Sequence, residues 1–335
     1  KHQWQVECCP VIEDSSLKMT IKNAPAREFQ IAISIRSAGP DSCELIEAVQ
    51  LDPGYPPWAR PIKRRLFKRR LKKFFQYKHE LIKHDLCLFS KYPVDRPLKV
   101  LILGATGLIG SATSTFLECA GHEVWKLVRK KRNLASNEIR WDPEKGQVNW
   151  KELEGFDAVI NLAGFGVGER RWTPEVKREI FDSRVSTTEK LLKLLVSLKS
   201  PPKALLCASA VGYYGDHQSE TVDEGAVSQP VGFLPRVCRE WEAASRQIHI
   251  EGMRVVNMRF GAVLSPKKGA FKRAIFPFKW GVGAIVGSGE QYVSWVALDD
   301  AVAAIYHCLM QDSIEGAVNI VAPEPITNAY FTKAL

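Results

Sequence analysis

The sequence lacks the features that mark several common classes of protein. No apolar run reaches the roughly 18 residues that a membrane-spanning helix requires. None of the eight cysteines forms a Cys-x-x-Cys pair, and the seven histidines add no metal-ligand spacing to them. The first residues show no charged segment followed by an apolar stretch, so no signal peptide is predicted. We therefore expect no membrane span, no metal site, and a reducing compartment, either the cytoplasm or the equivalent stroma of an organelle.

Most of the chain also lacks an excess of positive or negative charge. The 335 residues carry a formal net charge of +10, but residues 60–83 alone contain eleven lysines and arginines and a single acid, Glu80. The other 36 basic and 36 acidic residues cancel. The basic character therefore belongs to one segment, and a weak contact with a polyanion is expected, if anywhere, through residues 60–83.

The pattern of the first part of the chain predicts several strands followed by one helix. Apolar and β-branched runs lie around 3–8, 17–23, 28–36 and 42–50, and an amphipathic helical pattern covers about 58–84. An antiparallel meander closed by a long helix resembles the second half of a helix-grip (START-like) domain. That resemblance implies a partial α+β domain over 1–87 with an apolar cavity, and hence an apolar ligand.

The remainder of the chain has a different pattern. Residues 88–97, with two prolines, are predicted to be a linker. From Leu98 onward, short apolar strands alternate with helical segments, which is typical of a doubly wound parallel α/β sheet of the Rossmann type. The predicted domain covers 98–335 and includes a small substrate lobe. Because the sequence stops inside a helix-like pattern, we expect this lobe to be incomplete at its C-terminus.

A glycine-rich turn follows the first strand of this domain. The apolar strand 99–103 leads into the sequence Gly-Ala-Thr-Gly-Leu-Ile-Gly, after which a helix begins. The first glycine permits a tight turn, the second lets backbone approach a pyrophosphate, and the third lets the helix pack on the strand. The predicted phosphate-binding residues are Gly104, Thr106, Gly107, Leu108, Ile109 and Gly110.

The next strand ends in a cluster of cations. An NAD site would place an acidic residue about 20 residues after the glycines to hold the ribose 2′-hydroxyl. Here the strand 123–128 ends in Arg129-Lys-Lys-Arg132. Arg129 is well placed to bind a 2′-phosphate, with Lys130 as possible support, so the predicted cofactor is NADP(H). The alternative is that these residues form a solvated basic turn.

Two later strands reach the same edge of the sheet, where ligands bind in open α/β folds. One is followed by Asn161, Leu162, Ala163 and Gly164, which we assign to the cofactor site. The other ends at Ser209 and continues into a Gly-Tyr-Tyr-Gly loop. The candidate catalytic residues are therefore Ser209, Tyr213 and Tyr214, with aromatic packing an equal alternative for the tyrosines.

These segments resemble the extended short-chain dehydrogenase/reductases, the epimerase/dehydratase superfamily. The stretches 170–173, 183–184, 208–216, 239–242, 259–264, 287–291 and 294–295 resemble one atypical, epimerase-like branch that is sometimes labelled cell-division-inhibitor-like. Some members of that branch carry a helix-grip domain before the Rossmann domain. The resemblance implies that Gln291 and Trp295 line the substrate pocket.

One departure from the superfamily limits the chemistry. Standard members use a Tyr-x-x-x-Lys pair, in which the lysine holds the nicotinamide ribose and lowers the tyrosine pKa. None of the eight tyrosines here has a lysine four residues later, and the corresponding positions are Leu234 and Cys238. Cys238 is interpreted as a buried, inert thiol rather than a nucleophile. Arg259, on a buried strand, is expected to need an ion-pair partner.

Two functions remain open at this point. The first is an NADP(H)-dependent oxidoreductase or epimerase that acts on an unidentified small molecule. The second is a non-catalytic NADP(H)-binding regulator or scaffold, which the loss of the Tyr-x-x-x-Lys pair favours. The sequence does not determine the substrate, the direction of the reaction or the oligomeric state.

Overall fold

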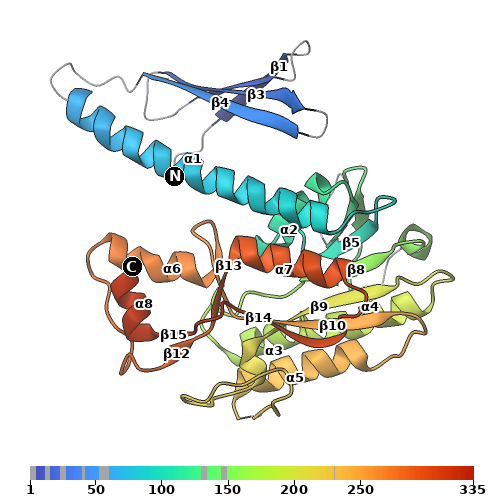
Figure 1. Cartoon of the computed structure of the whole chain (residues 1–335). Coiled ribbons are helices and arrows are strands. Elements are labelled where there is room, and N and C mark those ends of the chain that lie inside the picture. The colour runs from blue at the N-terminus through green and yellow to red at the C-terminus, as the bar shows by residue number, and fades with distance from the viewer. Residues whose placement is uncertain are drawn as a thin grey trace. The chain divides into compact units, whose positions relative to one another are not determined.

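The computed structural model describes residues 5–11, 16–22, 28–39, 42–52, 60–129, 134–144, 149–229 and 231–335 (Figure 1). The chain divides into two compact units, Lys1–Leu86 and Cys87–Leu335.

The first unit contains a four-stranded antiparallel sheet. Its strands lie in the order β1-β2-β3-β4, each paired with the next in sequence. This arrangement confirms the predicted meander, with the bounds β1 (Gln5–Val11), β2 (Ser16–Lys22), β3 (Glu28–Gly39) and β4 (Ser42–Asp52). The buried carboxylate of Glu47 on β4 contacts Lys78 and lies 3.1 Å from Nε2 of His79. Both partners belong to helix α1 (Arg60–Lys91), so these contacts join the helix to the sheet.

The surface of α1 is strongly basic and is less amphipathic than predicted. Lysines and arginines at 68, 69, 70, 72 and 73 are exposed. Phe74 is 55% exposed, although Phe75 and Leu71 are half-buried. The helix-grip cavity and the polyanion contact of residues 60–83 both stay predictions.

Helix α1 extends seven residues beyond its predicted end, into the segment that was predicted to be a linker. Leu88 and Phe89 pack against the core of the second unit, and the Phe89 ring lies 5.1 Å from that of Phe116. Tyr92 is 9% exposed, and its hydroxyl contacts Nδ1 of His307. The prediction of a linker at 88–97 underestimated these apolar side chains, whose helical spacing places them on the face of α1 that meets the core.

The second unit is built on a seven-stranded sheet in the order β14-β10-β9-β8-β5-β6-β7. Every pairing in it is parallel, which confirms the predicted Rossmann-type architecture. The strands are β5 (Lys99–Leu103), β6 (Glu123–Val128), β7 (Glu138–Arg140), β8 (Ala158–Asn161), β9 (Ala204–Ala210), β10 (Arg254–Phe260) and β14 (Gly316–Ile320). Strand β5 pairs with β6 on one side and β8 on the other, so the chain reverses its direction across the sheet at β5 and leaves a crevice there.

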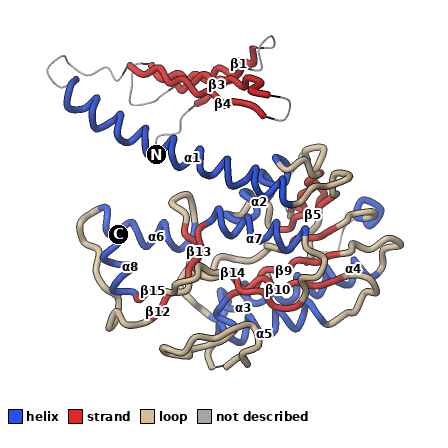
Figure 2. Tube along the Cα trace, in the orientation of Figure 1, coloured by secondary structure: helices blue, strands red, loops and turns tan. Residues whose placement is uncertain are grey.

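Both faces of this sheet are covered, as apolar parallel strands require. Along β5, Val100 and Ile102 join one core cluster, whereas Leu101 and Leu103 join another. Figures 1 and 2 show α7 on one face of the sheet and α5 on the other. The covering helices are α2 (Leu108–Cys119), α3 (Pro174–Asp182), α4 (Val185–Val196), α5 (Phe233–Arg246) and α7 (Leu298–Met310).

A small lobe lies beyond the carboxyl ends of the strands. Its elements are β11 (Ala262–Leu264) paired with β13 (Trp295–Ala297), β12 (Tyr292–Val293) paired with β15 (Ile326–Thr327), α6 (Gly269–Lys279) and α8 (Asn328–Ala334). Among the described residues, no helix has the length and apolar character needed to cross a membrane. The same residues contain no cluster of three or more potential metal ligands.

Candidate functional site

The turn from β5 into α2 requires glycine at two positions. Gly104 has φ of +75°, and a Cβ built on it would lie 2.6 Å from the carbonyl oxygen of Leu162. A Cβ on Gly110 would lie 2.3 Å from the carbonyl oxygen of Gly104. These contacts explain why the first and third glycines are required: the first adopts a left-handed conformation, and the third lets α2 pack on the turn.

The N-terminus of α2 opens onto this turn. Gly107 is its N-cap, no side chain caps the helix, and its first turn contains no acidic residue. The helix therefore begins with unpaired N–H groups and the positive end of its dipole, which suit a phosphate. Leu108 and Ile109 are the first residues of the helix, so they contribute backbone rather than side-chain groups to such a site.

A cavity of about 580 Å³ collects residues from several strand ends. It is lined by Gly104 and Thr106 after β5, Arg129 after β6, and Ala163 and Gly164 after β8. Five predicted cofactor residues from three separate segments thus face one space. Lys130 lies outside the described residues.

Asn161 shapes this cavity without lining it. Its side chain is buried, and Oδ1 accepts a hydrogen bond from the backbone N–H of Ala163 at 3.2 Å. The amide Nδ2 donates to Oγ1 of Thr188 at 3.0 Å. Asn161 therefore fixes the turn after β8, in which Leu162 forms the close backbone contact with Gly104.

The end of the cavity beside β6 contains groups that sequence reasoning missed. A guanidinium nitrogen of Arg129 lies 3.1 Å from Oε1 of Glu144, and both side chains are exposed. Glu138 and Trp141 also line this end. Oε2 of Glu138 accepts a hydrogen bond from the backbone N–H of Ala135. The site thus holds acidic groups as well as the predicted cation. The alternation of polar and apolar residues over 138–141 is the sequence signal for this additional strand.

Ser209 belongs to a buried ionic network. Its hydroxyl donates to Oε1 of Glu242 at 2.7 Å, and Glu242 is fully buried. Arg259 donates to both oxygens of this carboxylate, at 2.8 and 2.9 Å, which confirms the expected ion pair. Burial lowers the pKa of Arg259, but hydrogen bonds from its guanidinium to Glu242 and Tyr214 outweigh that effect, and the net pKa is raised. Arg259 therefore stays charged.

The two tyrosines of the following loop surround the same arginine. The Tyr214 hydroxyl accepts from Arg259 at 2.9 Å and donates to Oδ1 of Asn319 at 2.7 Å. The guanidinium carbon of Arg259 lies 3.6 Å from the centre of the Tyr213 ring. The structure thus brings all three candidate catalytic residues to one network, where the hydroxyls of Ser209 and Tyr214 are held by protein partners.

Cys238 occupies the position of the missing lysine, on α5. It is 5% exposed. Burial raises the pKa of its thiol to about 11, although the nearby charge of Arg184 acts in the opposite direction. The thiol is therefore protonated near neutral pH, as expected of an inert cysteine.

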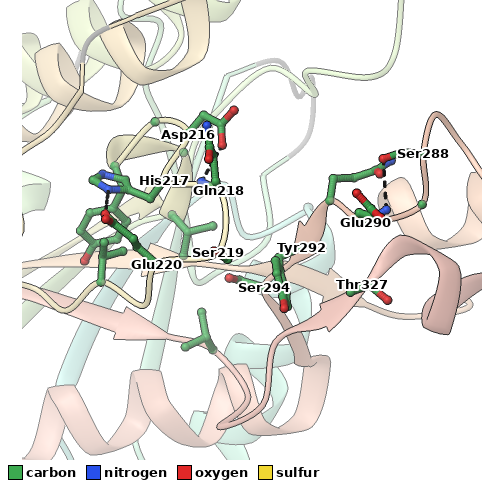
Figure 3. Close-up of a pocket in the computed structure, with 18 of the residues that line it drawn as sticks. Asp216, His217, Gln218, Ser219, Glu220, Ser288, Glu290, Tyr292, Ser294 and Thr327 are labelled. Carbon is green, nitrogen blue, oxygen red and sulfur yellow. Dashed lines mark hydrogen bonds and ion pairs between the residues drawn. The ribbon is translucent and has the colours of Figure 1, made fainter.

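A second cavity, of about 910 Å³, lies between the loop after β9 and the lobe (Figure 3). Figure 3 shows His217 and Glu220 on one side of it and Ser288 and Glu290 on the other. Nδ1 of His217 lies 3.5 Å from a carboxylate oxygen of Glu220. The lining also includes Gln291, whose amide donates to the carbonyl oxygen of Val286. Among the described residues, no lysine or arginine lines this cavity. His217 was not singled out by the sequence pattern.

Trp295 does not share this cavity with Gln291. It lines a smaller one of about 420 Å³ together with Asp300 and Glu324, and its indole donates to the carbonyl oxygen of Glu324 at 3.1 Å. The two predicted substrate residues therefore lie in neighbouring parts of the lobe and face different spaces.

These features together define a dinucleotide-binding Rossmann protein. They are the parallel sheet, the glycine turn, the uncapped N-terminus of α2 and the cavity at β5, where the strand order reverses. The sequence matches the NAD dependent epimerase/dehydratase family over residues 100–321, and the chain belongs to this family. The family binds nicotinamide dinucleotides, and this chain is an NAD(P)-binding member of it.

Individual relatives are also similar to this chain in sequence. The epimerase family protein Mb2239 of Mycobacterium bovis is 42% identical over 235 residues, which cover 70% of this chain and 77% of that protein. The human epimerase family protein SDR39U1 is 33% identical over 245 residues, covering 71% of this chain and 79% of the human one.

Two solved structures are similar to the chain. Human SDR39U1 (isoform 2), determined with NADPH, has a TM-score of 0.63 and 33% identity, and covers 70% of this chain and 77% of the human one. The nucleoside-diphosphate sugar epimerase of Corynebacterium glutamicum has a TM-score of 0.77 and 29% identity. It covers 95% of this chain, including part of the first unit, whereas this chain spans 65% of its length.

Proposed function

We propose that the protein is an NADP(H)-dependent oxidoreductase or epimerase that acts on a small molecule. The observation that carries this proposal is the 580 Å³ cavity, in which residues following β5, β6 and β8 converge beside the N-terminus of α2. Gly104, Thr106 and the first N–H groups of α2 would hold the pyrophosphate. When bound, the nicotinamide supplies hydride transfer.

The preference for NADP(H) over NAD(H) rests on Arg129. The Arg129 guanidinium contacts the exposed carboxylate of Glu144, which a 2′-phosphate would displace in favour of a stronger charge-assisted contact. The human relative was determined with NADPH, in keeping with this assignment. Glu138 and Glu144 lie close by and would oppose a 2′-phosphate, so the selectivity is expected to depend on Arg129 itself.

Titration of the purified protein with NADPH and NADH tests this assignment. We expect Arg129→Ala to weaken the binding of NADPH by about ten- to a hundredfold, because a hydrogen bond to a charged group contributes about 1.5–3 kcal/mol. The affinity for NADH should stay nearly unchanged. Arg140→Ala, at an exposed position in the neighbouring strand β7, is the matched control. Equal losses for both nucleotides would contradict the assignment.

The second cavity is the candidate substrate site. Asp216, Glu220 and Glu290 line it, and no described lysine or arginine does, so its charge favours an uncharged or positively charged polar molecule. A nucleoside diphosphate sugar, the substrate class in the name of the Corynebacterium glutamicum relative, would bring phosphate charge toward these carboxylates. We therefore infer an uncharged or cationic small molecule as the substrate.

A second function, cofactor binding without turnover, is favoured by a specific observation. The hydroxyls of Ser209 and Tyr214 are engaged in the Glu242–Arg259 network, and Leu234 and Cys238 replace the usual tyrosine and lysine. A screen of carbonyls, alcohols and amines with NADPH or NADP⁺ separates the two functions. Oxidation or reduction of the cofactor by an uncharged or cationic compound would establish the enzyme, whereas stoichiometric binding without turnover would establish a regulator or scaffold.

A further inference from the structure

A short segment of the lobe reaches the glycine turn. It comprises residues 265–273, which follow β11 and include the first residues of α6. Nζ of Lys268 donates to the carbonyl oxygen of Thr106 at 3.4 Å. A Cβ on Gly269 would lie 3.4 Å from Cδ2 of Leu108, the first residue of α2, so the backbone of the segment packs on the start of that helix. This segment, which we call the strap, therefore contacts the part of the cofactor site assigned to the pyrophosphate.

The strap also reaches the loop after β8. A Cβ on Gly168 would lie 3.0 Å from Nη1 of Arg273, so the guanidinium lies against this loop. In the same loop, Gly164 and Gly166 line the 580 Å³ cavity. A dinucleotide crosses the crevice where the strand order reverses, which here lies between the turn after β5 and the loop after β8. The strap thus contacts both walls of the crevice in which the pyrophosphate would lie.

The charge of the strap is entirely positive. The segment contains no acidic residue, and its basic residues are Lys267, Lys268, Lys272 and Arg273. Both Lys268 and Arg273 are exposed, and no carboxylate of the described residues lies within 4.0 Å of either cation. Glu169, in the loop after β8, lines the cavity, but its carboxylate lies over Gly166, where a Cβ would be 2.5 Å from Oε1. Cations without a carboxylate partner attract anions, so the strap favours a phosphate group at this position.

We propose that the strap closes over the cofactor and that Lys268 and Arg273 bind its pyrophosphate from the lobe. Lys268 would exchange its 3.4 Å contact with the neutral carbonyl oxygen of Thr106 for a charge-assisted hydrogen bond to a phosphate oxygen, which is shorter and roughly twice as strong. Because the strap joins β11 to α6, this contact makes the position of the lobe depend on the cofactor. The inference rests on the proposed NADP(H)-dependent function and adds two cations to the N–H groups of α2.

Three ligands separate the role of the strap from that of Arg129. NADPH and NADH both contain the pyrophosphate, whereas adenosine 2′-phosphate lacks it and keeps the group assigned to Arg129. In calorimetric titrations, we expect Lys268→Ala and Arg273→Ala each to weaken NADPH and NADH equally. The loss should be on the order of five- to tenfold, between the values for an exposed ion pair and for a hydrogen bond to a charged group. The affinity for adenosine 2′-phosphate should stay within about twofold. Lys279→Ala, at the exposed last residue of α6, is the matched control and should change none of the three affinities.

Two conservative substitutions distinguish the charge of Lys268 from a structural role. Lys268→Arg keeps the cation and should retain most of the affinity for NADPH. Lys268→Gln can still donate a hydrogen bond to Thr106 but carries no charge, so it should lose as much affinity as Lys268→Ala. Full affinity in Lys268→Gln would show that the contact with Thr106 serves only the structure of the turn, and it would overturn the inference.

Hydrogen exchange measures the closure of the strap itself. In the wild type, NADPH and NADH should each slow the exchange of backbone amides in residues 267–273, and adenosine 2′-phosphate should not. Unchanged exchange with both dinucleotides, or unchanged affinity for them in Lys268→Ala, would refute the closure of the strap while leaving the cofactor assignment intact. A wild-type protein that binds neither dinucleotide would instead refute the proposed function, and the inference with it.

Discussion

Glu242 provides the sharpest prediction about the candidate catalytic region. It is fully buried, and Arg259, its partner, is 2% exposed. Glu242→Gln keeps the shape of the side chain but leaves the Arg259 guanidinium without a counter-charge. Breaking a buried ion pair from one side costs about 3–5 kcal/mol. We therefore expect Glu242→Gln to lower the free energy of unfolding by about that amount.

A double-mutant cycle separates the pair from its surroundings. Arg259→Met alone should cost a similar amount, because it leaves the buried Glu242 carboxylate with only the Ser209 hydroxyl and the half-exposed Arg246, 3.8 Å away. The combined Glu242→Gln/Arg259→Met variant should be destabilised by about 2 kcal/mol less than the sum of the two single variants. Urea unfolding followed by tryptophan fluorescence measures these values. Glu240→Gln, a more exposed carboxylate on the same helix, is the control and should cost less than about 1 kcal/mol.

Additive effects, or single-variant costs below about 1 kcal/mol, would refute this reasoning. The network would then not hold Ser209 in place through Glu242, and its hydroxyl would be available to a substrate carbonyl. The cycle thus bears directly on the choice between an enzyme and a non-catalytic binding protein.

Two further predictions concern the cofactor site and the dependence of stability on pH. Glu144→Gln should strengthen NADPH binding severalfold, because it frees Arg129 and removes a negative charge near the 2′-phosphate position. Calorimetric titration measures this change. Weaker binding would show that Glu144 helps to orient Arg129. Burial lowers the pKa of His122 below its ordinary value of 6.5, and Nδ1 accepts a hydrogen bond from Leu98 N–H. The unfolded chain therefore takes up this proton first, so stability should fall as pH decreases below about 6.5. Urea unfolding should show a shallower fall for His122→Gln, and an unchanged pH dependence would exclude His122 as a contributor.

The cofactor loop was predictable from sequence because its determinants are local. Gly104 and Gly110 lie in one short turn, and their spacing determines both the backbone path and the approach of the helix. Arg129 follows the next strand directly, so its place at the sheet edge also followed from the alternation of strands and helices.

The parts of the site that sequence reasoning missed depend on contacts between distant segments. Glu138 enters the cavity from β7 and Trp141 directly follows that strand. No local pattern determines the place of this three-residue strand beside β6. The engagement of Ser209 by Glu242 joins residues 33 positions apart. The sequence indicated that Arg259 needs a partner, but only the packing of α5 on the sheet identified Glu242 as that partner.

Residues 88–97, at the start of the second unit, show a related limit. Two prolines predicted a linker over 88–97, yet Leu88, Phe89 and Tyr92 pack on the Rossmann unit. Prolines indicate where a helix must end, but they do not determine which neighbouring apolar side chains find a partner in the core.

The central claim is that the glycine turn and α2 hold a nicotinamide dinucleotide with a preference for NADP(H). Calorimetric titration of NADPH and NADH into the wild-type protein and Gly107→Asp tests it most directly, because aspartate at the N-cap keeps the helix start but places a negative charge at the phosphate position. We predict that the wild type binds one nucleotide per chain and binds NADPH more tightly than NADH. The Gly107→Asp variant should bind neither nucleotide. Absence of binding to the wild type, or equal binding to the variant, would contradict the account.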